Sequence, residues 1–350
     1  MNALIFDGGK FVKCMAVTLL AVGVNMLPAS DALAARLAVG SYHTLAIKGD
    51  GTVWAWGADG SGASAFPLQV SGLTRATSVS ASGGVSAAVK SNGTVWVWGA
   101  RASLTPVQVS GLTDVIAVVV GGKSVALKSD GSVWTWEYSA GVNTVPVRVT
   151  GLDNIIAIDR RFHALNANGT VWMWGYSGAA QTVPVRVTGL ADVRAIAVSI
   201  DHVLALRPGG TVWGWGNNVY GQLGDGTQID RITPVQAIGL TNVKSITSAN
   251  RVSQAVKSDG AVWMWGSTSS GAITRVVGGN PAPRMYAQPI GPLSNSSIEA
   301  TVSDEGHSIS LRSDGSAMGW GLNTSGQIGT GRFSSWPFFN VSPSLVATDF

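Results

Sequence analysis

The feature that most constrains this chain is a short motif that recurs seven times. Its first copy is Asp-Gly-Thr-Val-Trp-Ala-Trp-Gly at residues 50–57, and close variants follow along the chain. The glycine at the second position of each copy falls at residues 51, 93, 131, 169, 210, 260 and 315, at spacings of 38 to 55 residues. Thirteen of the 14 tryptophans lie in these copies, so each copy marks one unit of an internal repeat.

Each unit has the pattern of four short strands. Residues 114–120 and 124–128 are typical of the first and second strands, Val-Trp-x-Trp of the third, and residues 105–109 of the fourth. Between the second and third strands, the Asp-Gly or Asn-Gly pair predicts a two-residue type I′ turn with positive φ at both positions. Seven such units predict an all-β, seven-bladed β-propeller with four antiparallel strands per blade, which fills residues 35–350 as one domain.

Residues 1–34 differ from the repeats. Lys10 and Lys13 precede an apolar run that ends before Pro28, and Ala32-Leu-Ala34 follows as a small-x-small cleavage pattern. The run is short for a membrane-spanning helix, so we expect a cleaved signal peptide and a secreted or periplasmic protein without a membrane anchor. An uncleaved anchor is the alternative. Cys14, the single cysteine, lies in this segment, so the mature chain would have no disulfide.

The two tryptophans of each motif stand at i and i+2, so both project from the same face of the strand. In a ring of blades that face meets the neighbouring blade, and we expect the tryptophans to hold the blades together. A sugar-stacking platform is the alternative. The predicted packing residues are Trp54, Trp56, Trp96, Trp98, Trp134, Trp136, Trp172, Trp174, Trp213, Trp215, Trp263, Trp265 and Trp320.

The repeat resembles that of the regulator-of-chromosome-condensation family. The matching residues are Gly-Ser-Tyr-His-Thr-Leu-Ala-Ile-Lys at 40–48 with the run up to Gly57, and Asn-Asn-Val-Tyr-Gly-Gln-Leu-Gly-Asp-Gly-Thr at 217–227. A partial echo of the latter stands at residues 325–329. The resemblance covers the whole mature chain and implies a seven-bladed propeller, but it does not fix a function because propellers serve many.

Two branches of this family suggest different functions. Nuclear members act as nucleotide exchange factors for a small GTPase and bind chromatin, and a guanine-nucleotide-exchange-like regulator is one alternative here. Secreted bacterial members with similar short repeats include an inhibitor of β-lactamases that binds the enzyme with the loops of one face. The net charge of +4 gives little reason to expect nucleic-acid binding. We therefore expect a bacterial, monomeric, secreted protein that binds a protein partner.

No arrangement of residues in the sequence indicates catalysis. Three of the four histidines, at 43, 202 and 307, occupy one position of the repeat on separate blades, which favours a structural role over a metal site. There is no phosphate-binding loop, no triad spacing and no paired carboxylates. We expect no metal, no cofactor and no enzymatic activity, with a carbohydrate-binding or hydrolytic propeller as the alternative.

One rim of the ring concentrates aromatic and basic residues. In a four-stranded antiparallel blade, the loops between strands one and two and between strands three and four lie at the same end. All five tyrosines are assigned to those loops, and tyrosine and arginine are enriched at the centres of protein interfaces. The predicted partner-binding residues are Tyr42, Lys123, Tyr138, Arg160, Arg161, Phe162, Tyr176, Tyr220, Arg251, Arg284 and Tyr286.

Closure of the ring is a separate expectation. The first unit opens with only a brief strand at residues 36–40, and the last continues to residues 345–348. We expect the two ends of the chain to share one blade, since a bare strand edge would expose unpaired backbone.

Overall fold

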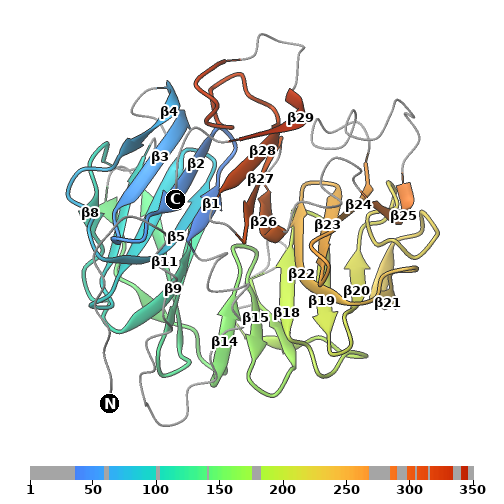
Figure 1. Cartoon of the computed structure of the whole chain (residues 1–350). Coiled ribbons are helices and arrows are strands. Elements are labelled where there is room, and N and C mark those ends of the chain that lie inside the picture. The colour runs from blue at the N-terminus through green and yellow to red at the C-terminus, as the bar shows by residue number, and fades with distance from the viewer. Residues whose placement is uncertain are drawn as a thin grey trace, which may run out of the picture.

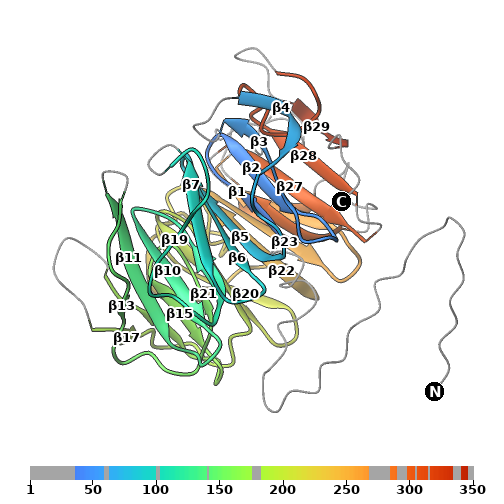
Figure 2. The ribbon, with the colours of Figure 1, turned by 90° about the vertical axis from the view of Figure 1, so that its left-hand side faces the viewer.

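Seven separate antiparallel sheets make up the computed structural model, and they are arranged around a ring (Figures 1 and 2). The structure describes residues 36–58, 63–99, 103–139, 142–175, 183–267, 284–289, 298–303, 306–313, 316–333 and 340–345. Each sheet contains the strands of one repeat in chain order, and we number these blades 1 to 7. The predicted seven-bladed, all-β propeller is confirmed.

Each blade runs outward from its first strand. The first strands are β1 (Leu37–Val39), β5 (Ala76–Ser82), β9 (Val115–Val119), β14 (Ile155–Ile158), β18 (Ala195–Val198), β22 (Val243–Ala249) and β26 (Ile298–Ser303). The second strands are β2 (His43–Ile47), β6 (Val85–Lys90), β10 (Lys123–Lys128), β15 (His163–Asn166), β19 (His202–Arg207), β23 (Val252–Lys257) and β27 (His307–Arg312).

The third strands carry the tryptophan motif. They are β3 (Val53–Ala58), β7 (Val95–Gly99), β11 (Val133–Ser139), β16 (Val171–Met173), β20 (Thr211–Gly216), β24 (Val262–Gly266) and β28 (Ala317–Gly321). The fourth strands are long in β4 (Ala63–Gln69), β21 (Arg231–Gln236), β25 (Arg284–Pro289) and β29 (Asn340–Leu345) and only two residues long in β8 (Val107–Gln108), β13 (Val147–Arg148) and β17 (Val185–Arg186). In blade 3, β12 (Val142–Asn143) also pairs with β11.

The turn between strands two and three differs from the prediction in blade 1. There the Gly51 amide donates to the Lys48 carbonyl and the Lys48 amide donates to the Thr52 carbonyl, so the loop has three residues rather than two. Only Gly51 has a positive φ (79°), whereas Asp50 does not. In blade 1 this is a type I turn followed by a glycine bulge, so the type I′ prediction was wrong there. In blade 5 the Gly-Gly pair has positive φ at both Gly209 (81°) and Gly210 (73°), as the prediction required. Asp50 accepts hydrogen bonds from the Thr52 hydroxyl (2.6 Å) and amide (2.9 Å), which explains the Asp-Gly-Thr order.

The glycine of this turn also joins each blade to the next. The Gly51 carbonyl accepts a hydrogen bond from the amide of Ala76, at the start of blade 2. A Cβ added at Gly51 would lie 2.9 Å from the Cα of Arg75, so a side chain at this position would collide with the neighbouring backbone. Arg75 itself has a positive φ of 58°. The same amide-to-glycine hydrogen bond recurs from Val115, Ile155, Val193 and Val243 to Gly93, Gly131, Gly169 and Gly210.

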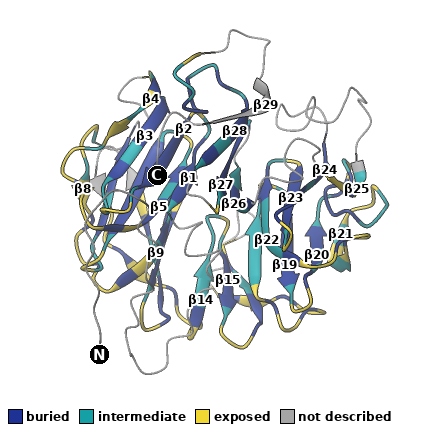
Figure 3. Ribbon diagram, in the orientation of Figure 1, coloured by how far each residue is buried: buried dark blue, intermediate teal, exposed yellow. Residues whose placement is uncertain are grey.

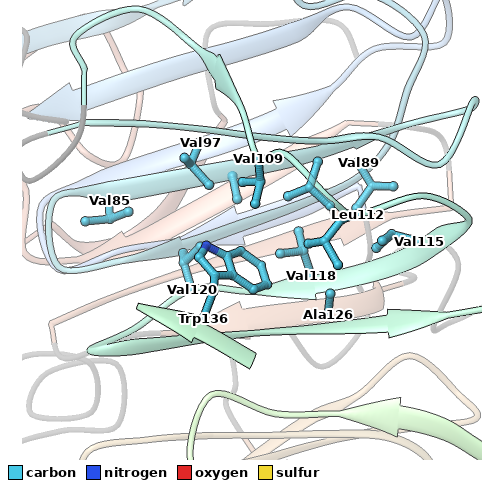
Figure 4. Packing of buried hydrophobic residues seen from close by; sticks show 12 residues of the cluster. Val85, Val89, Val97, Val109, Leu112, Val115, Val118, Val120, Ala126 and Trp136 are labelled. Atoms are coloured by element: carbon cyan, nitrogen blue, oxygen red, sulfur yellow. The ribbon is translucent and has the colours of Figure 1, made fainter. Parts of the chain in front are cut away.

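The hydrophobic core is divided among the junctions between blades. Seven buried clusters lie within the described residues, and each contains residues of two neighbouring blades. At the junction of blades 2 and 3, Trp136 packs on Val85, Val97, Val109 and Val120 (Figure 4). Buried residues line the middle of the blades, and exposed residues lie mostly in the turns (Figure 3).

The two tryptophans of each motif are not equivalent. The second is buried in every blade, for example Trp98 and Trp265, and contributes to a junction cluster. The first is only half-buried within the described blades that carry it. Trp54 donates its indole N–H to the Thr52 hydroxyl, and the Lys48 ammonium lies 4.0 Å from the centroid of its ring. The first tryptophan therefore covers the outer part of the junction rather than its centre.

Among the described residues, β1 to β4 form blade 1 and β26 to β29 form blade 7, with no strand shared between them. Residues 346–350, on which the predicted sharing of a blade partly rests, lie outside the described residues. A core cluster unites Leu37, Val39 and Trp56 of blade 1 with Ile309 and Leu311 of blade 7. Side-chain packing therefore closes the ring among these residues.

The predicted signal peptide at residues 1–34 lies outside the described residues. Within the part of the chain that the structure describes, there is no helix long and apolar enough to cross a membrane.

Candidate functional site: the loop rim

One end of every blade carries the loops between strands one and two and between strands three and four, because the strands follow one another in antiparallel order. We call this end the loop rim. The opposite end carries the tight glycine turns and the crossovers between blades. The loop rim receives the long segment of blade 5, residues 217–230, whereas the connections described at the opposite end are short.

Several predicted partner-binding residues lie at the surface of this rim. Tyr42 is 52% exposed, and Arg161 and Arg251 are also exposed. Arg251 of blade 6 donates to the hydroxyl of Tyr220 (3.0 Å), with its guanidinium carbon 4.6 Å from the Tyr220 ring centroid. Residues of two blades are thereby held as one aromatic and basic surface.

Other predicted residues lie elsewhere than expected. Tyr138 belongs to strand β11, and Arg284 and Tyr286 belong to strand β25, so these three are not in loops. The ring of Phe162 faces Trp174 at a centroid distance of 5.8 Å and is half-buried in the core between blades 3 and 4. Tyr176 lies outside the described residues.

Two of the basic residues are engaged within the protein. Lys123 forms an ion pair with Glu137 (3.0 Å), and Arg160 donates to the Ser82 hydroxyl (3.3 Å). Loops of blades 1 to 4 meet there around a depression of about 290 Å³, lined largely by glycines together with Arg160 and Arg161. Small loop residues leave the backbone accessible at this point, and the two arginines give it positive charge.

Hydrogen bonds of its own side chains hold the long loop of blade 5 in place. The Asn218 side chain accepts from the Leu223 amide (2.9 Å) and donates to Asp225 (2.9 Å), while Gln222 accepts from the Tyr220 amide. Leu223 is fully buried at the centre of this loop. The loop therefore presents Tyr220 from a fixed scaffold. We call residues 218–224 a latch because the main chain of Gln222 also binds side chains of blade 6.

The latch of blade 5 completes a polar joint with blade 6. The Gln222 carbonyl accepts from the Trp265 indole (2.8 Å) and from the Ser253 hydroxyl (2.7 Å). Ser253 in turn contacts Nε2 of His202 at 2.8 Å. A glycine at position 214 makes room for the latch, since a Cβ there would lie 3.2 Å from Leu223.

The latch of blade 7 (residues 323–329) repeats this joint on blade 1. The Gln327 carbonyl accepts from the Trp56 indole (3.0 Å) and the Thr44 hydroxyl (2.8 Å), and Nε2 of His307 lies 3.0 Å from the same hydroxyl. Gly319 again leaves space, here for Ile328. Of the latch residues, only Tyr220 was among the predicted partner-binding residues. The sequence signal of both latches is Gly-Trp-Gly, at residues 214–216 and 319–321, followed by Gly-Gln-Leu-Gly or Gly-Gln-Ile-Gly.

Asp225 binds the Asn218 side chain of the latch of blade 5. Burial opposes its ionisation, but hydrogen bonds from Thr227, Arg231 and Asn218 outweigh burial and lower the pKa of its carboxyl. The Arg231 guanidinium lies 2.8 Å from the Asp225 carboxylate. The Asp225 carboxylate is thus charged, and its hydrogen bonds to Asn218, Thr227 and Arg231 hold the latch in place.

The polar joint of blades 5 and 6 has the connectivity of a serine-hydrolase triad without its accessibility. Nε2 of His202 contacts Ser253, and Nδ1 of His202 lies 3.1 Å from Asp201. However, Ser253 and His202 are buried, and the serine hydroxyl already donates to Gln222. A nucleophile must reach its substrate, so this group holds blades together. Among the residues described, no three His, Cys, Asp or Glu side chains are grouped to bind a metal ion.

A larger cavity of about 640 Å³ opens between blades 4 and 5. Arg161, Met173 and Trp215 line it, together with Asp230 and Ile232 of the long loop and outer strand of blade 5. Ile232 is 97% exposed. The cavity joins an apolar floor to a mixed-charge edge, which suits a side chain of a protein partner.

Comparisons with known proteins agree with this geometry. The family model described as "Regulator of chromosome condensation (RCC1) repeat" matches residues 209–256, and a second model of the same description matches residues 35–63 and 193–222. This chain is a propeller that carries regulator-of-chromosome-condensation repeats at residues 35–63 and 193–256. The matched segments include His43, His202 and the latch of blade 5, whereas the compact blades 2 to 4 lie outside them. No curated protein matches the sequence.

Solved propellers share the fold at low sequence identity. Prp20p from Saccharomyces cerevisiae is 19% identical, with 89% of this chain and 76% of that chain covered and a TM-score of 0.51. Human WBSCR16 is 20% identical, with 89% and 81% covered and a TM-score of 0.50. The ectodomain of the Arabidopsis thaliana receptor kinase ACR4 is 16% identical, with 87% and 98% covered and a TM-score of 0.51.

Proposed function

We propose that this protein is a secreted, non-enzymatic propeller that binds a partner protein through its loop rim. The observation that carries the proposal is the set of exposed side chains Tyr42, Arg161 and Arg251 on the loop rim, with Arg251 bonded to the half-buried Tyr220 of the hydrogen-bonded loop of blade 5. Aromatic and arginine side chains give the largest energies in protein interfaces, and a preorganised loop loses little entropy on binding.

Protein binding has a precedent among propellers of this fold. The structure of Prp20p was described together with its binding to Gsp1p and histones. For the present chain we propose an extracellular or periplasmic partner, because residues 1–34 have the pattern of a signal peptide. An enzyme inhibitor of the β-lactamase-inhibitor type is the specific form that this proposal takes. An exchange-factor-like regulator is the second candidate, supported by the family repeats alone.

Export is tested by N-terminal sequencing of the protein recovered outside the cytoplasm. We expect the mature chain to begin at Ala35, after the Ala-Leu-Ala pattern. Exported material that still begins at Met1 would contradict the signal-peptide assignment.

The partner is tested by immobilising the mature chain and capturing proteins from periplasmic and culture fluid. In parallel, the mature chain is titrated against a panel of β-lactamases while hydrolysis is followed. The inhibitor form of the proposal predicts stoichiometric loss of hydrolysis for at least one enzyme. A captured partner without any effect on β-lactamases would retain the binding function and reject the inhibitor form, whereas nucleotide release from a GTPase would favour the second candidate.

A further inference from the structure

Among the described residues, the junction between blades 1 and 2 contains the polar joint of the latched junctions but no latch. His43, Ser86 and Trp98 stand where His202, Ser253 and Trp265 stand between blades 5 and 6. The register is the same, since Ser86 pairs with Trp98 and Ser253 pairs with Trp265 across their strands. Nε2 of His43 lies 2.9 Å from the Ser86 hydroxyl, as at the latched junctions.

The acceptor that completes the joint is missing at this junction. The Trp98 indole N–H is buried and has no hydrogen-bond partner, and Trp98 as a whole is 2% exposed. At the two latched junctions one main-chain carbonyl accepts from the corresponding tryptophan and from the corresponding hydroxyl. Blade 1 turns back at once, because Ala58 pairs with Ala63. An unpaired buried N–H has a free-energy cost that a bound acceptor would remove.

A cavity lies beside Trp98, but the Trp98 indole nitrogen and Ser86 are themselves closed to solvent, so an acceptor that enters the cavity has to displace the side chains that cover them. A cavity of about 330 Å³ is lined by Ala55 and Gly57 of blade 1 and by Trp98 of blade 2. Leu68 and Leu104 also line it and are 60% and 62% exposed. Ala55 occupies the position of Gly214 and Gly319, where the latched blades leave room for a leucine or an isoleucine. Larger residues stand at this position in the remaining blades: Val97, Thr135, Met173 and Met264.

We propose that this groove binds a peptide turn of a partner protein that replaces the missing latch. The turn would offer a main-chain carbonyl to Trp98 and Ser86 and a small aliphatic side chain to the space above Ala55. The two latches of the chain itself define this chemistry, because Gln222-Leu223 and Gln327-Ile328 supply the same pair of groups at the junctions of blades 5 and 6 and of blades 7 and 1. The Trp320 indole also lacks a partner among the described residues, but there Met264 fills the position that Ala55 leaves open.

This site does not depend on the function proposed for the loop rim. It uses none of Tyr42, Arg161, Tyr220 or Arg251. A substitution at Ala55 leaves those residues in place, so failure of the groove proposal and failure of the rim proposal give different results.

The test uses the mature chain with 15N-labelled tryptophan indoles and a synthetic peptide with the sequence of residues 217–227 as the probe. We expect the peptide to shift the indole resonance of Trp98, assigned with Trp98→Phe, and to leave those of Trp265 and Trp56 unchanged. Ala55→Met should weaken binding at least tenfold by filling the space. Trp98→Phe should weaken it about fivefold, the loss expected for one hydrogen bond. A peptide in which Leu223 is replaced by aspartate is the matched control and should not bind.

A second measurement covers a free peptide that binds too weakly to detect. Residues 58–63 are replaced by the sequence of residues 217–230, together with Ala55→Gly, to supply the latch within the chain. We expect the Trp98 resonance to move and Tm to rise by about 2 °C or more. The proposal is overturned if neither the peptide nor the grafted loop affects Trp98, which would mean that only solvent occupies the groove, or if Ala55→Met leaves peptide binding unchanged.

Discussion

Blade 5 and blades 2 to 4 pack against the next blade in different ways. Blade 5 has glycine between its two tryptophans and covers the junction with its latch, whose Gln222 carbonyl binds Trp265. The compact blades have Val97, Thr135 or Met173 between the tryptophans and outer strands of only two residues. A junction can thus be covered either by the backbone of a long loop or by a side chain of the strand itself. Within the described residues, the first solution also places a hydrogen-bonded loop on the loop rim.

The two solutions should differ most when a tryptophan is removed. Trp265→Ala should lower the free energy of unfolding by about 4–5 kcal/mol, because it opens a cavity and leaves the Gln222 carbonyl without a donor. Trp320→Ala should cost about 3 kcal/mol, since Trp320 is equally buried but its indole N–H has no partner among the described residues and its junction is filled by Met264. Urea unfolding of both variants measures the difference. Equal losses would show that the latch adds nothing to its junction.

Removing a carboxylate from blade 5 or from compact blade 3 compares the two kinds of blade a second time. Asp225→Ala should lower the free energy of unfolding by about 2–3 kcal/mol, because Asp225 is buried and holds Asn218, Thr227 and Arg231. Asp153→Ala in compact blade 3 removes an exposed ion pair with Arg148 and should cost less than about 1 kcal/mol. If the two variants have the same stability, the latch is not held by Asp225.

The junction of blades 7 and 1 should be sensitive to pH. Burial, and to a lesser extent the charge of His43, lowers the pKa of His307 from 6.5 to about 3. Between these values the unfolded chain takes up a proton that the folded chain does not, so stability falls as the pH is lowered from about 6.5 towards 3. The loss amounts to about 1.4 kcal/mol per pH unit.

The measurement is urea unfolding of the wild-type protein and of His307→Gln from pH 7.5 down to pH 4.5. We expect the advantage of the wild type to shrink as the pH falls. An advantage that is independent of pH would mean that His307 takes up its proton in the folded protein at the same pH as in the unfolded chain.

Most of the fold could be predicted from the repeat. Copies of Asp-Gly-Thr-Val-Trp were enough to predict seven blades, because strand alternation and turn residues are local properties of the sequence. The turn type of blade 1 was wrong because the Asp50 side chain bonds Thr52 and the loop closes over three residues, whereas the prediction considered a loop of two. Ring closure by side chains could not be predicted either, since it depends on Trp56 and Ile309 packing into one cluster at the junction of blades 1 and 7.

The candidate site was harder to predict than the fold. Tyr42 and Arg251 lie on the loop rim as their places in the repeat suggested. Phe162 and Tyr286 differ, because one packs on Trp174 and the other belongs to an outer strand whose start could not be located within a long insertion. The unpaired Trp98 could be recognised only by comparing its surroundings with those of Trp56 and Trp265, which requires coordinates.

The central claim, that the loop rim binds the partner, is tested most directly by comparing two matched triple variants against a captured partner. The first variant combines Tyr42→Ala, Arg161→Ala and Arg251→Ala on the loop rim. The second combines Thr74→Ala, Ser110→Ala and Thr241→Ala, which are exposed in the crossovers of the opposite end. Dissociation constants and melting temperatures are measured for both.

We expect the loop-rim variant to lose at least about a hundredfold in affinity, since interface anchors of this kind contribute about 2 kcal/mol or more when truncated. Its melting temperature should stay close to that of the wild type, because exposed side chains contribute little to folding stability. The opposite-end variant should bind as the wild type does. Full binding by the loop-rim variant, with loss of binding by the other, would contradict the account and place the interface on the face of the glycine turns.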